Sequence, residues 1–195
     1  MEKRENQELI RVEKTGGNTR GVAVTALLLA IGVILRLVSP SIAGITPNWL
    51  IAMYCLAILI VRPGLKQSAG IGLVAGVVCM ATSKAIFPYA NLISEPVGAV
   101  ACALVAGLTG RLKIFGLTLQ PAVSTFIGTL VSGFVFITLT KLVMNIPMQV
   151  YLYGMLPVVL TVGAVNCVVA QVLYFPAVKL FAGKPAAVAA KEEKA

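Results

Sequence analysis

The chain alternates long apolar runs with short segments rich in glycine, proline and polar residues. A helix needs about 20 apolar residues to cross a bilayer core of about 30 Å, so runs of that length predict membrane spans. Six runs fit, the second being short and the sixth long: Gly21–Val38, Asn48–Arg62, Gln67–Ile86, Ser94–Gly110, Gln120–Leu142 and Tyr153–Phe181. The pattern predicts an all-α fold, an integral membrane six-helix bundle.

Composition supports the bilayer as the solvent. Hydrophobic residues make up 58% of the 195 residues and charged residues 12%, against about 25% charged in soluble domains. Glu95 is the only acidic residue between Gly21 and Lys179. We therefore expect a charged tail at 1–20, a membrane domain of six transmembrane helices at 21–182 and a second charged tail at 183–195.

The positions of lysine and arginine predict the orientation. Five lie in the N-terminal tail, two in the turn 62–66, two in 111–113 and four from Lys179 onward, whereas the loops 38–48, 87–93 and 143–152 have none. By the positive-inside rule both termini are cytoplasmic and those three loops face outward. A signal peptide cleaved near Ser41 and Ala43 is the alternative for the first run, but its removal would contradict this charge distribution.

Several enzymatic and binding classes lack the residues they require. The chain has no histidine and no aspartate, which excludes a Ser-His-Asp triad, an aspartate pair and an H-E-x-x-H zinc helix. It has no P-loop motif, so it cannot hydrolyse ATP by that route. The four cysteines each lie singly in an apolar run, without metal-ligand spacing, and we interpret them as small buried hydrophobes. We therefore expect no cofactor or metal. The net charge is +9, but the basic residues do not form the stripe with aromatic residues that is typical of nucleic-acid binding.

Polar residues gather at the predicted outer ends of the spans, where they are costly unless they face a cavity or reach the headgroups. They are Arg36, Asn48, Lys84, Asn91, Glu95 and Lys141, with Asn145 and Gln149. Glu95 is either a charge favoured by a helix N-terminus or the partner of a ligand ammonium. One of the cations is a candidate for a ligand carboxylate, although each alone is also explained by snorkelling.

Aromatic side chains lie in the same outer segments. Trp49, Phe87 and Tyr89 fit an interfacial aromatic belt, but Phe87 and Tyr89 also flank Pro88 close to Asn91 and Glu95. They are therefore candidates for a stacking wall beside the polar contacts. Asn166 and Gln171, deep in the sixth run, are expected to hydrogen bond between helices. The small-residue rows in runs three and four are expected to pack helices together within the bundle.

Three stretches resemble a known family: "TALLLAIGVILRLVSPSIAGITPNWLIAMYCLAI", "GIGLVAGVVCMATSKAIFPYANLISEPVGAV" and "GTLVSGFVFITLTKLVMNIP" with "MLPVVLTVGAVNCVVAQVLYFP". They look like the tryptophan transporters, which are substrate-binding S-components of energy-coupling factor (ECF) importers. The resemblance implies a non-enzymatic six-helix bundle that binds tryptophan, or a related small molecule, from outside under loops one, three and five. In the third loop, Ser94 stands where we expect an acidic residue, which leaves open a different ligand or a structural Glu95.

The resemblance also implies partners. S-components dock on a transmembrane coupling subunit that carries two cytoplasmic ATPases, through small residues four apart on the first helix. Ala26 and Ala30 match that spacing. The alternatives are a self-sufficient secondary transporter, or a small channel, and a structural membrane protein. A proton-coupled carrier usually needs a relay of ionisable groups across the membrane, and a single Glu95 provides none.

Overall fold

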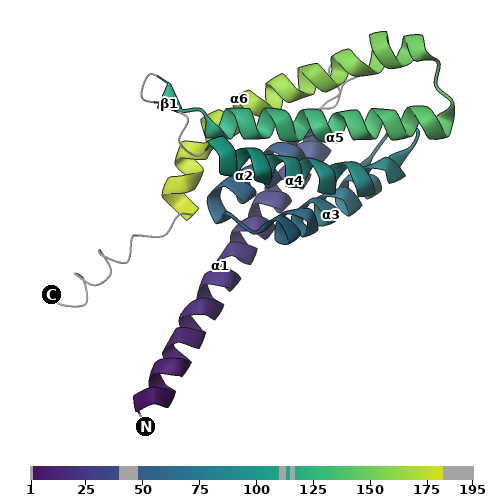
Figure 1. Cartoon of the computed structure of the whole chain (residues 1–195). Coiled ribbons are helices and arrows are strands. Elements are labelled where there is room, and N and C mark those ends of the chain that lie inside the picture. The colour runs from purple at the N-terminus through teal and green to yellow at the C-terminus, as the bar shows by residue number, and fades with distance from the viewer. Residues whose placement is uncertain (1, 40–47, 110–112, 115–116, 182–195) are drawn as a thin grey trace.

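The computed structural model describes residues 2–39, 48–109, 113–114 and 117–181, and it is helical (Figure 1). A 3-10 turn, η1 (Pro88–Ala90), precedes the fourth helix, and a π-helix, η2 (Val150–Met155), precedes the sixth. The six α-helices are α1 (Glu2–Val38), α2 (Trp49–Val61), α3 (Leu65–Thr82), α4 (Asn91–Thr109), α5 (Gln120–Met144) and α6 (Leu156–Phe181). The predicted helical fold class is confirmed, but the structure is not purely α-helical. Two short antiparallel strands, β1 (Lys113–Ile114) and β2 (Leu117–Thr118), pair in the connection between α4 and α5.

Five helical stretches are long and apolar enough to cross a membrane: Thr19–Val38, Leu65–Thr82, Pro88–Thr109, Gln120–Met144 and Val150–Phe181. The remaining helix, α2, has 13 residues, about 20 Å at the usual rise of about 1.5 Å per residue. It is nevertheless the most enclosed element, because every residue from Leu50 to Leu59 is buried. A helix that is apolar on all sides can be buried on all sides. The other helices surround it, and two buried clusters lie against it.

Several boundaries differ from the sequence prediction. α1 begins at Glu2 rather than at Gly21, and its N-terminal half extends away from the bundle (Figure 1). α3 stops at Thr82, because Ser83 is extended, so Lys84 lies in a loop instead of in a helix. The possible cleavage site at Ser41 and Ala43 lies outside the described residues, as do most of loop one and the C-terminal tail from 182.

The start of α4 changes the interpretation of Glu95. The helix begins at Asn91, so Glu95 lies beyond its first turn instead of at its N-terminus. The favourable effect of a helix dipole on a carboxylate falls off within the first turn. An N-terminal helix charge is therefore a weak explanation of Glu95, and its partners must come from other helices.

Two glycines allow α4 to approach its neighbours closely. A Cβ on Gly72 of α3 would lie 2.6 Å from the carbonyl oxygen of Glu95 and 2.8 Å from the Cβ of Ala99. A Cβ on Gly98 of α4 would lie 2.6 Å from the Cβ of Ser132 on α5. The contact between Gly72 and Ala99 confirms the predicted packing of small residues between the third and fourth runs, whereas Gly107 at the end of the fourth run has nothing within 4 Å of its Cβ position. The contact at Gly98 also brings α5 within reach of Glu95.

Candidate ligand-binding cavity

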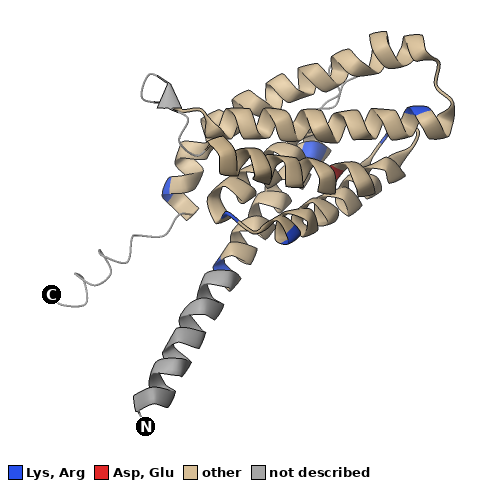
Figure 2. Ribbon diagram, in the orientation of Figure 1, with Lys and Arg blue, Asp and Glu red and all other residues tan. Residues whose placement is uncertain are grey.

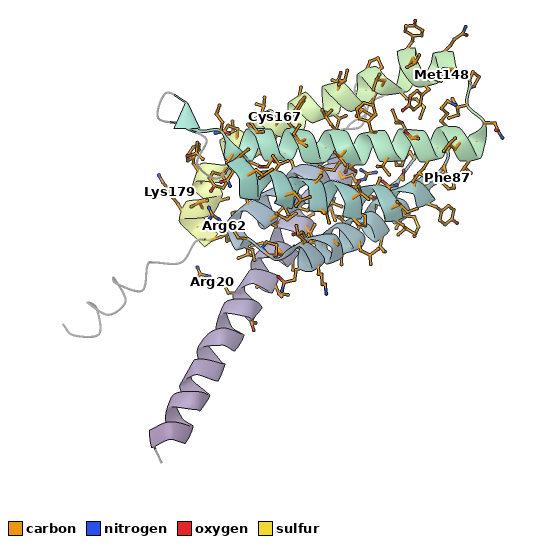
Figure 3. All side chains as sticks on the ribbon, in the orientation of Figure 1. Arg20, Arg62, Phe87, Met148, Cys167 and Lys179 are labelled. Carbon is orange, nitrogen blue, oxygen red and sulfur yellow. The ribbon has the colours of Figure 1, made fainter. Side chains whose placement is uncertain are left out.

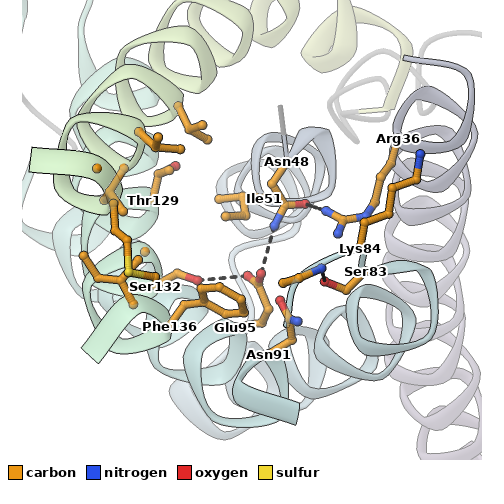
Figure 4. Close-up of a pocket in the computed structure, with 18 residues that line it drawn as sticks. Arg36, Asn48, Ile51, Ser83, Lys84, Asn91, Glu95, Thr129, Ser132 and Phe136 are labelled. Atoms are coloured by element: carbon orange, nitrogen blue, oxygen red, sulfur yellow. Dashed lines mark hydrogen bonds between the residues drawn. The ribbon is translucent and has the colours of Figure 1, made fainter. Parts of the chain in front are cut away.

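A cavity of about 460 Å³ opens between the helices near the C-terminal end of α1 and the N-terminal end of α4. Its volume falls within the range of about 300–1,000 Å³ that is usual for small-molecule sites. We call it the Glu95 cavity. Its lining comprises Arg36, Asn48, Ile51, Ser83, Lys84, Ala85, Asn91, Glu95, Thr129, Ser132, Gly133, Phe136, Ile137, Gly154, Met155, Val158, Val159 and Val162 (Figure 4).

Glu95 accepts hydrogen bonds from three other helices or their flanking residues. Asn48 Nδ2 donates to Oε1 at 2.9 Å, while the Tyr54 hydroxyl and Ser132 Oγ donate to Oε2 at 3.0 and 3.2 Å. The Glu95 side chain is 1% exposed. An ionised carboxylate offers about four acceptor positions, so these three donors leave one on Oε1. Glu95 is thus a nearly saturated carboxylate with room for one more donor.

Arg36 belongs to the same hydrogen-bond network, but its bonds in the described structure go to Asn48 and Thr82 and not to Glu95. Its Nη1 donates to Asn48 Oδ1 at 2.8 Å and its Nε donates to Thr82 Oγ1 at 3.1 Å. Asn48 therefore stands between the cation and the carboxylate, with one amide atom bonded to each (Figure 4). Its backbone carbonyl also accepts from Asn166 Nδ2 at 3.3 Å. This one residue, at the N-terminus of α2, links α1, α4 and α6.

Lys84 differs from Arg36 in having no bonded partner. It lies in the loop between α3 and η1, is exposed, and has no hydrogen bond or ion pair within the described part of the chain. Figure 4 shows it beside Arg36 at the same side of the cavity. A free ammonium next to a restrained guanidinium makes this side of the Glu95 cavity suited to an anionic group.

The opposite side of the cavity is apolar. α5, η2 and α6 supply Gly133, Phe136, Ile137, Gly154, Met155, Val158, Val159 and Val162. Among the α5 residues at this side, Thr129 and Ser132 carry hydroxyls, and Ser132 donates to Glu95. The Glu95 cavity is therefore divided into a charged half and an apolar half, which suits a ligand with a zwitterionic head and a large apolar body.

Of the nine sequence-predicted contact residues, the structure brings five together at the cavity: Arg36, Asn48, Lys84, Asn91 and Glu95. Four do not line it. Trp49 donates from Nε1 to Ser39 Oγ at 2.7 Å. Phe87 and Tyr89 contact each other, with ring centroids 6.0 Å apart, and Tyr89 is 63% exposed. Lys141 lies in the last turn of α5, away from the lining.

The sequence prediction missed Tyr54, Thr129, Ser132 and Phe136. A signal existed on α5, because Thr129, Ser132 and Phe136 follow one another at spacings of three and four and so share a helix face. Tyr54 is isolated in an apolar run and gave no signal. Both predicted interhelical amides are confirmed, because each bonds to α5. Asn166 Nδ2 donates to Thr129 Oγ1 at 3.4 Å, and Gln171 Oε1 accepts from the Ala122 backbone N–H at 3.2 Å.

Ala26 and Ala30 lie in a separate place. Both are exposed and line a groove of about 770 Å³ between α1 and α3, bordered by Val33, Gly70 and Val74 among others. We call it the α1–α3 groove.

Of the four cysteines that were predicted to be buried, Cys55, Cys79 and Cys102 are buried and Cys167 is partly exposed.

In the described part of the chain, five helices of membrane-spanning length surround the buried α2, and a cavity of ligand size opens at one end of the bundle. These features define a multi-pass membrane protein. The chain belongs to the tryptophan transporter TrpP family, whose model matches residues 18–181. It is thus a transport protein of the cytoplasmic membrane and not an enzyme.

Curated relatives agree. The probable tryptophan transport protein of Clostridium perfringens is 30% identical over 168 residues, covering 80% of this chain and 90% of that protein. Those of Bacillus subtilis and Clostridium acetobutylicum are 30% and 27% identical, over 66% and 80% of this chain and 74% and 91% of their own lengths. No solved structure matches the chain.

Proposed function

We propose that this protein is the substrate-binding component of an ECF-type importer and that it captures tryptophan from the outside. A shared transmembrane coupling subunit with two cytoplasmic ATPases would then supply the energy. Membership of a tryptophan transporter family supports the substrate, and the lack of a P-loop requires ATP hydrolysis, if used, to occur on another chain. The divided Glu95 cavity is the observation that carries the proposal.

The proposed orientation has six crossings, both termini in the cytoplasm and the Glu95 cavity facing outward. Arg20, Arg62 and Lys179 lie at one end of the bundle, and Phe87 and Met148 at the other (Figure 3). Figure 2 shows lysine and arginine positions at both ends of the bundle. In the sequence, the charged tails at 1–20 and 183–195 flank the proposed substrate-binding domain at 21–182 and adjoin the helices that carry Arg20 and Lys179. The positive-inside rule therefore favours that end as cytoplasmic.

Tryptophan fits the two halves of the cavity. Its ammonium donates to the free acceptor position of Glu95 Oε1, and its carboxylate lies between Arg36 and Lys84. Its indole packs against the apolar surface of α5 and α6, with Phe136 as the aromatic neighbour. This arrangement replaces the predicted stacking wall of Phe87 and Tyr89, which lies outside the cavity lining.

Co-expression tests the proposal. Cells that produce this protein together with ECF coupling and ATPase subunits should accumulate labelled tryptophan, and cells that produce it alone should not. The same cells with an ATPase subunit inactivated at its P-loop lysine are the matched control. Full uptake by this protein alone, independent of ATP, would overturn the proposal and identify a secondary transporter or channel.

A further inference from the structure

The Thr129 hydroxyl is bonded differently from those of five other helical threonines. Five threonine hydroxyls donate to the backbone carbonyl four residues earlier, at 2.7–2.8 Å: those of Thr25, Thr82, Thr109, Thr140 and Thr161. This back-bonding satisfies the hydroxyl within its own helix. Thr129 makes no such bond in the described structure, although it is 2% exposed. Its hydroxyl is therefore available for a partner in the Glu95 cavity.

Asn166 fixes the position of that hydroxyl. Its Nδ2 is shared between the Asn48 carbonyl at 3.3 Å and Thr129 Oγ1 at 3.4 Å. Asn166 is fully buried, and its Oδ1 has no partner among the described residues. A hydroxyl oxygen accepts two hydrogen bonds, so Thr129 Oγ1 keeps one acceptor position after the long contact from Asn166. Buried polar groups normally have their hydrogen bonds satisfied, but this acceptor position of Thr129 Oγ1 has no donor among the described residues.

The placement of Thr129 determines which part of a ligand it meets. It lies on α5 three residues before Ser132, so both face the cavity from one side of the helix. Figure 4 shows Thr129 across the cavity from Arg36 and Lys84. A ligand whose charged head is held by the two cations and Glu95 therefore extends its other end toward Thr129. Around it the α6 residues Val158, Val159 and Val162 offer no side-chain hydrogen-bonding group.

We infer that Thr129 Oγ1 accepts a hydrogen bond from a ring N–H of the bound ligand, with Asn166 as the positioning residue. The site would then select an indole over an aromatic ring of the same size that lacks a donor. This inference rests on the proposed function, because it takes the ligand to be an aromatic amino acid held by its charged head. It adds the group that distinguishes tryptophan from other large apolar amino acids.

Calorimetric titration of the full-length protein in nanodiscs tests the inference. The two ligands are L-tryptophan and 3-benzothienyl-L-alanine, in which sulfur replaces the ring N–H. The wild type should bind tryptophan about tenfold more tightly, as one buried hydrogen bond allows. Thr129→Val should lose about tenfold in tryptophan affinity and leave benzothienylalanine unchanged. Thr129→Ser keeps the hydroxyl and should keep the preference.

Thr125→Val is the matched control. Thr125 lies one turn away on α5, is fully buried and has an unpartnered hydroxyl, but it does not line the cavity. It should keep the wild-type preference. Equal affinities of the wild type for the two ligands would overturn the inference whether or not Thr129→Val folds, as would an unchanged preference in folded Thr129→Val. Binding of neither ligand by the wild type would instead overturn the proposed function.

Discussion

The Glu95 cavity and the α1–α3 groove are both hollows beside α1, but they are built in different ways. The cavity is held by hydrogen bonds among Arg36, Asn48 and Glu95, which come from separate helices. The groove is lined by small and apolar residues such as Ala26, Ala30 and Gly70, and it exists because α1 packs on α2 and diverges from α3. Converging polar groups suit recognition of a charged small molecule, whereas small residues suit the close approach of another helix.

The largest difference between the two regions is expected when a glycine of α3 is replaced by leucine, at Gly72 near the Glu95 cavity or at Gly70 in the α1–α3 groove. Gly72 packs against the backbone of Glu95 and Pro96, and a Cβ there would lie 2.6 Å from each, so Gly72→Leu forces α3 and α4 apart. Overpacking costs about 1–3 kcal/mol, and more where backbone must move. Gly72→Leu should therefore lower the melting temperature in detergent and abolish tryptophan binding. Gly70→Leu is the matched control, because nothing lies within 4 Å of its Cβ position. Equal melting temperatures for the two variants would contradict the packing argument.

Removal of the charge in the cavity should have the next largest effect. Glu95→Gln keeps the shape of the side chain but replaces a charged acceptor for the ligand ammonium. Hydrogen bonds to charged groups contribute about 1.5–3 kcal/mol, so tryptophan affinity should fall about 10- to 100-fold. Titration calorimetry measures the fall. Ser132→Ala, which removes one donor to Glu95 and keeps the carboxylate, should bind more tightly than Glu95→Gln; affinity at the wild-type level in Glu95→Gln would remove Glu95 from the site.

The two cations should respond differently to replacement by methionine. Lys84 has no bonded partner in the described structure, so Lys84→Met should weaken tryptophan binding, by up to about fivefold for an exposed ion pair, and leave the melting temperature unchanged. Arg36→Met removes hydrogen bonds to Asn48 and Thr82, so it should lower both affinity and melting temperature. Thermal unfolding and titration of the same samples give the comparison. A stability loss in Lys84→Met alone would reverse the assignment of roles.

The sequence predicted the helical membrane fold well because hydrophobic length is a local property. It also placed the polar residues of the cavity, since Arg36, Asn48, Lys84, Asn91 and Glu95 stand out against apolar neighbours. Their hydrogen-bond partners could not be assigned in the same way. Asn48 reaches Glu95 across 47 positions in the chain, and such pairing depends on how the helices pack.

The predicted aromatic wall shows where local signals fail. Phe87 and Tyr89 are close to Glu95 in sequence, but they lie just before and within η1, and the first turn of α4 separates them from Glu95. Their rings contact each other instead of lining the cavity. The direction of a side chain in a short loop depends on backbone angles that residue type alone does not determine. The apolar half of the cavity comes instead from α5 and α6, far along the chain. Thr129 and Phe136 share a helix face with Ser132, but this spacing was overlooked because threonine and phenylalanine are ordinary residues in a membrane helix.

The α1–α3 groove should matter for transport while having the smallest effect on ligand binding. Ala30→Leu places a branched side chain in the groove, and a docking helix would be kept at a distance because such contacts depend on small residues. Tryptophan affinity of the isolated protein should stay at the wild-type value, since Ala30 does not line the Glu95 cavity. Uptake and co-purification with ECF coupling subunits should both fall. Ala23→Leu is the matched control, because Ala23 is exposed on the same helix but lies outside the groove lining. Wild-type uptake and co-purification in Ala30→Leu would show that the partner docks elsewhere and that the groove is a lipid-facing surface.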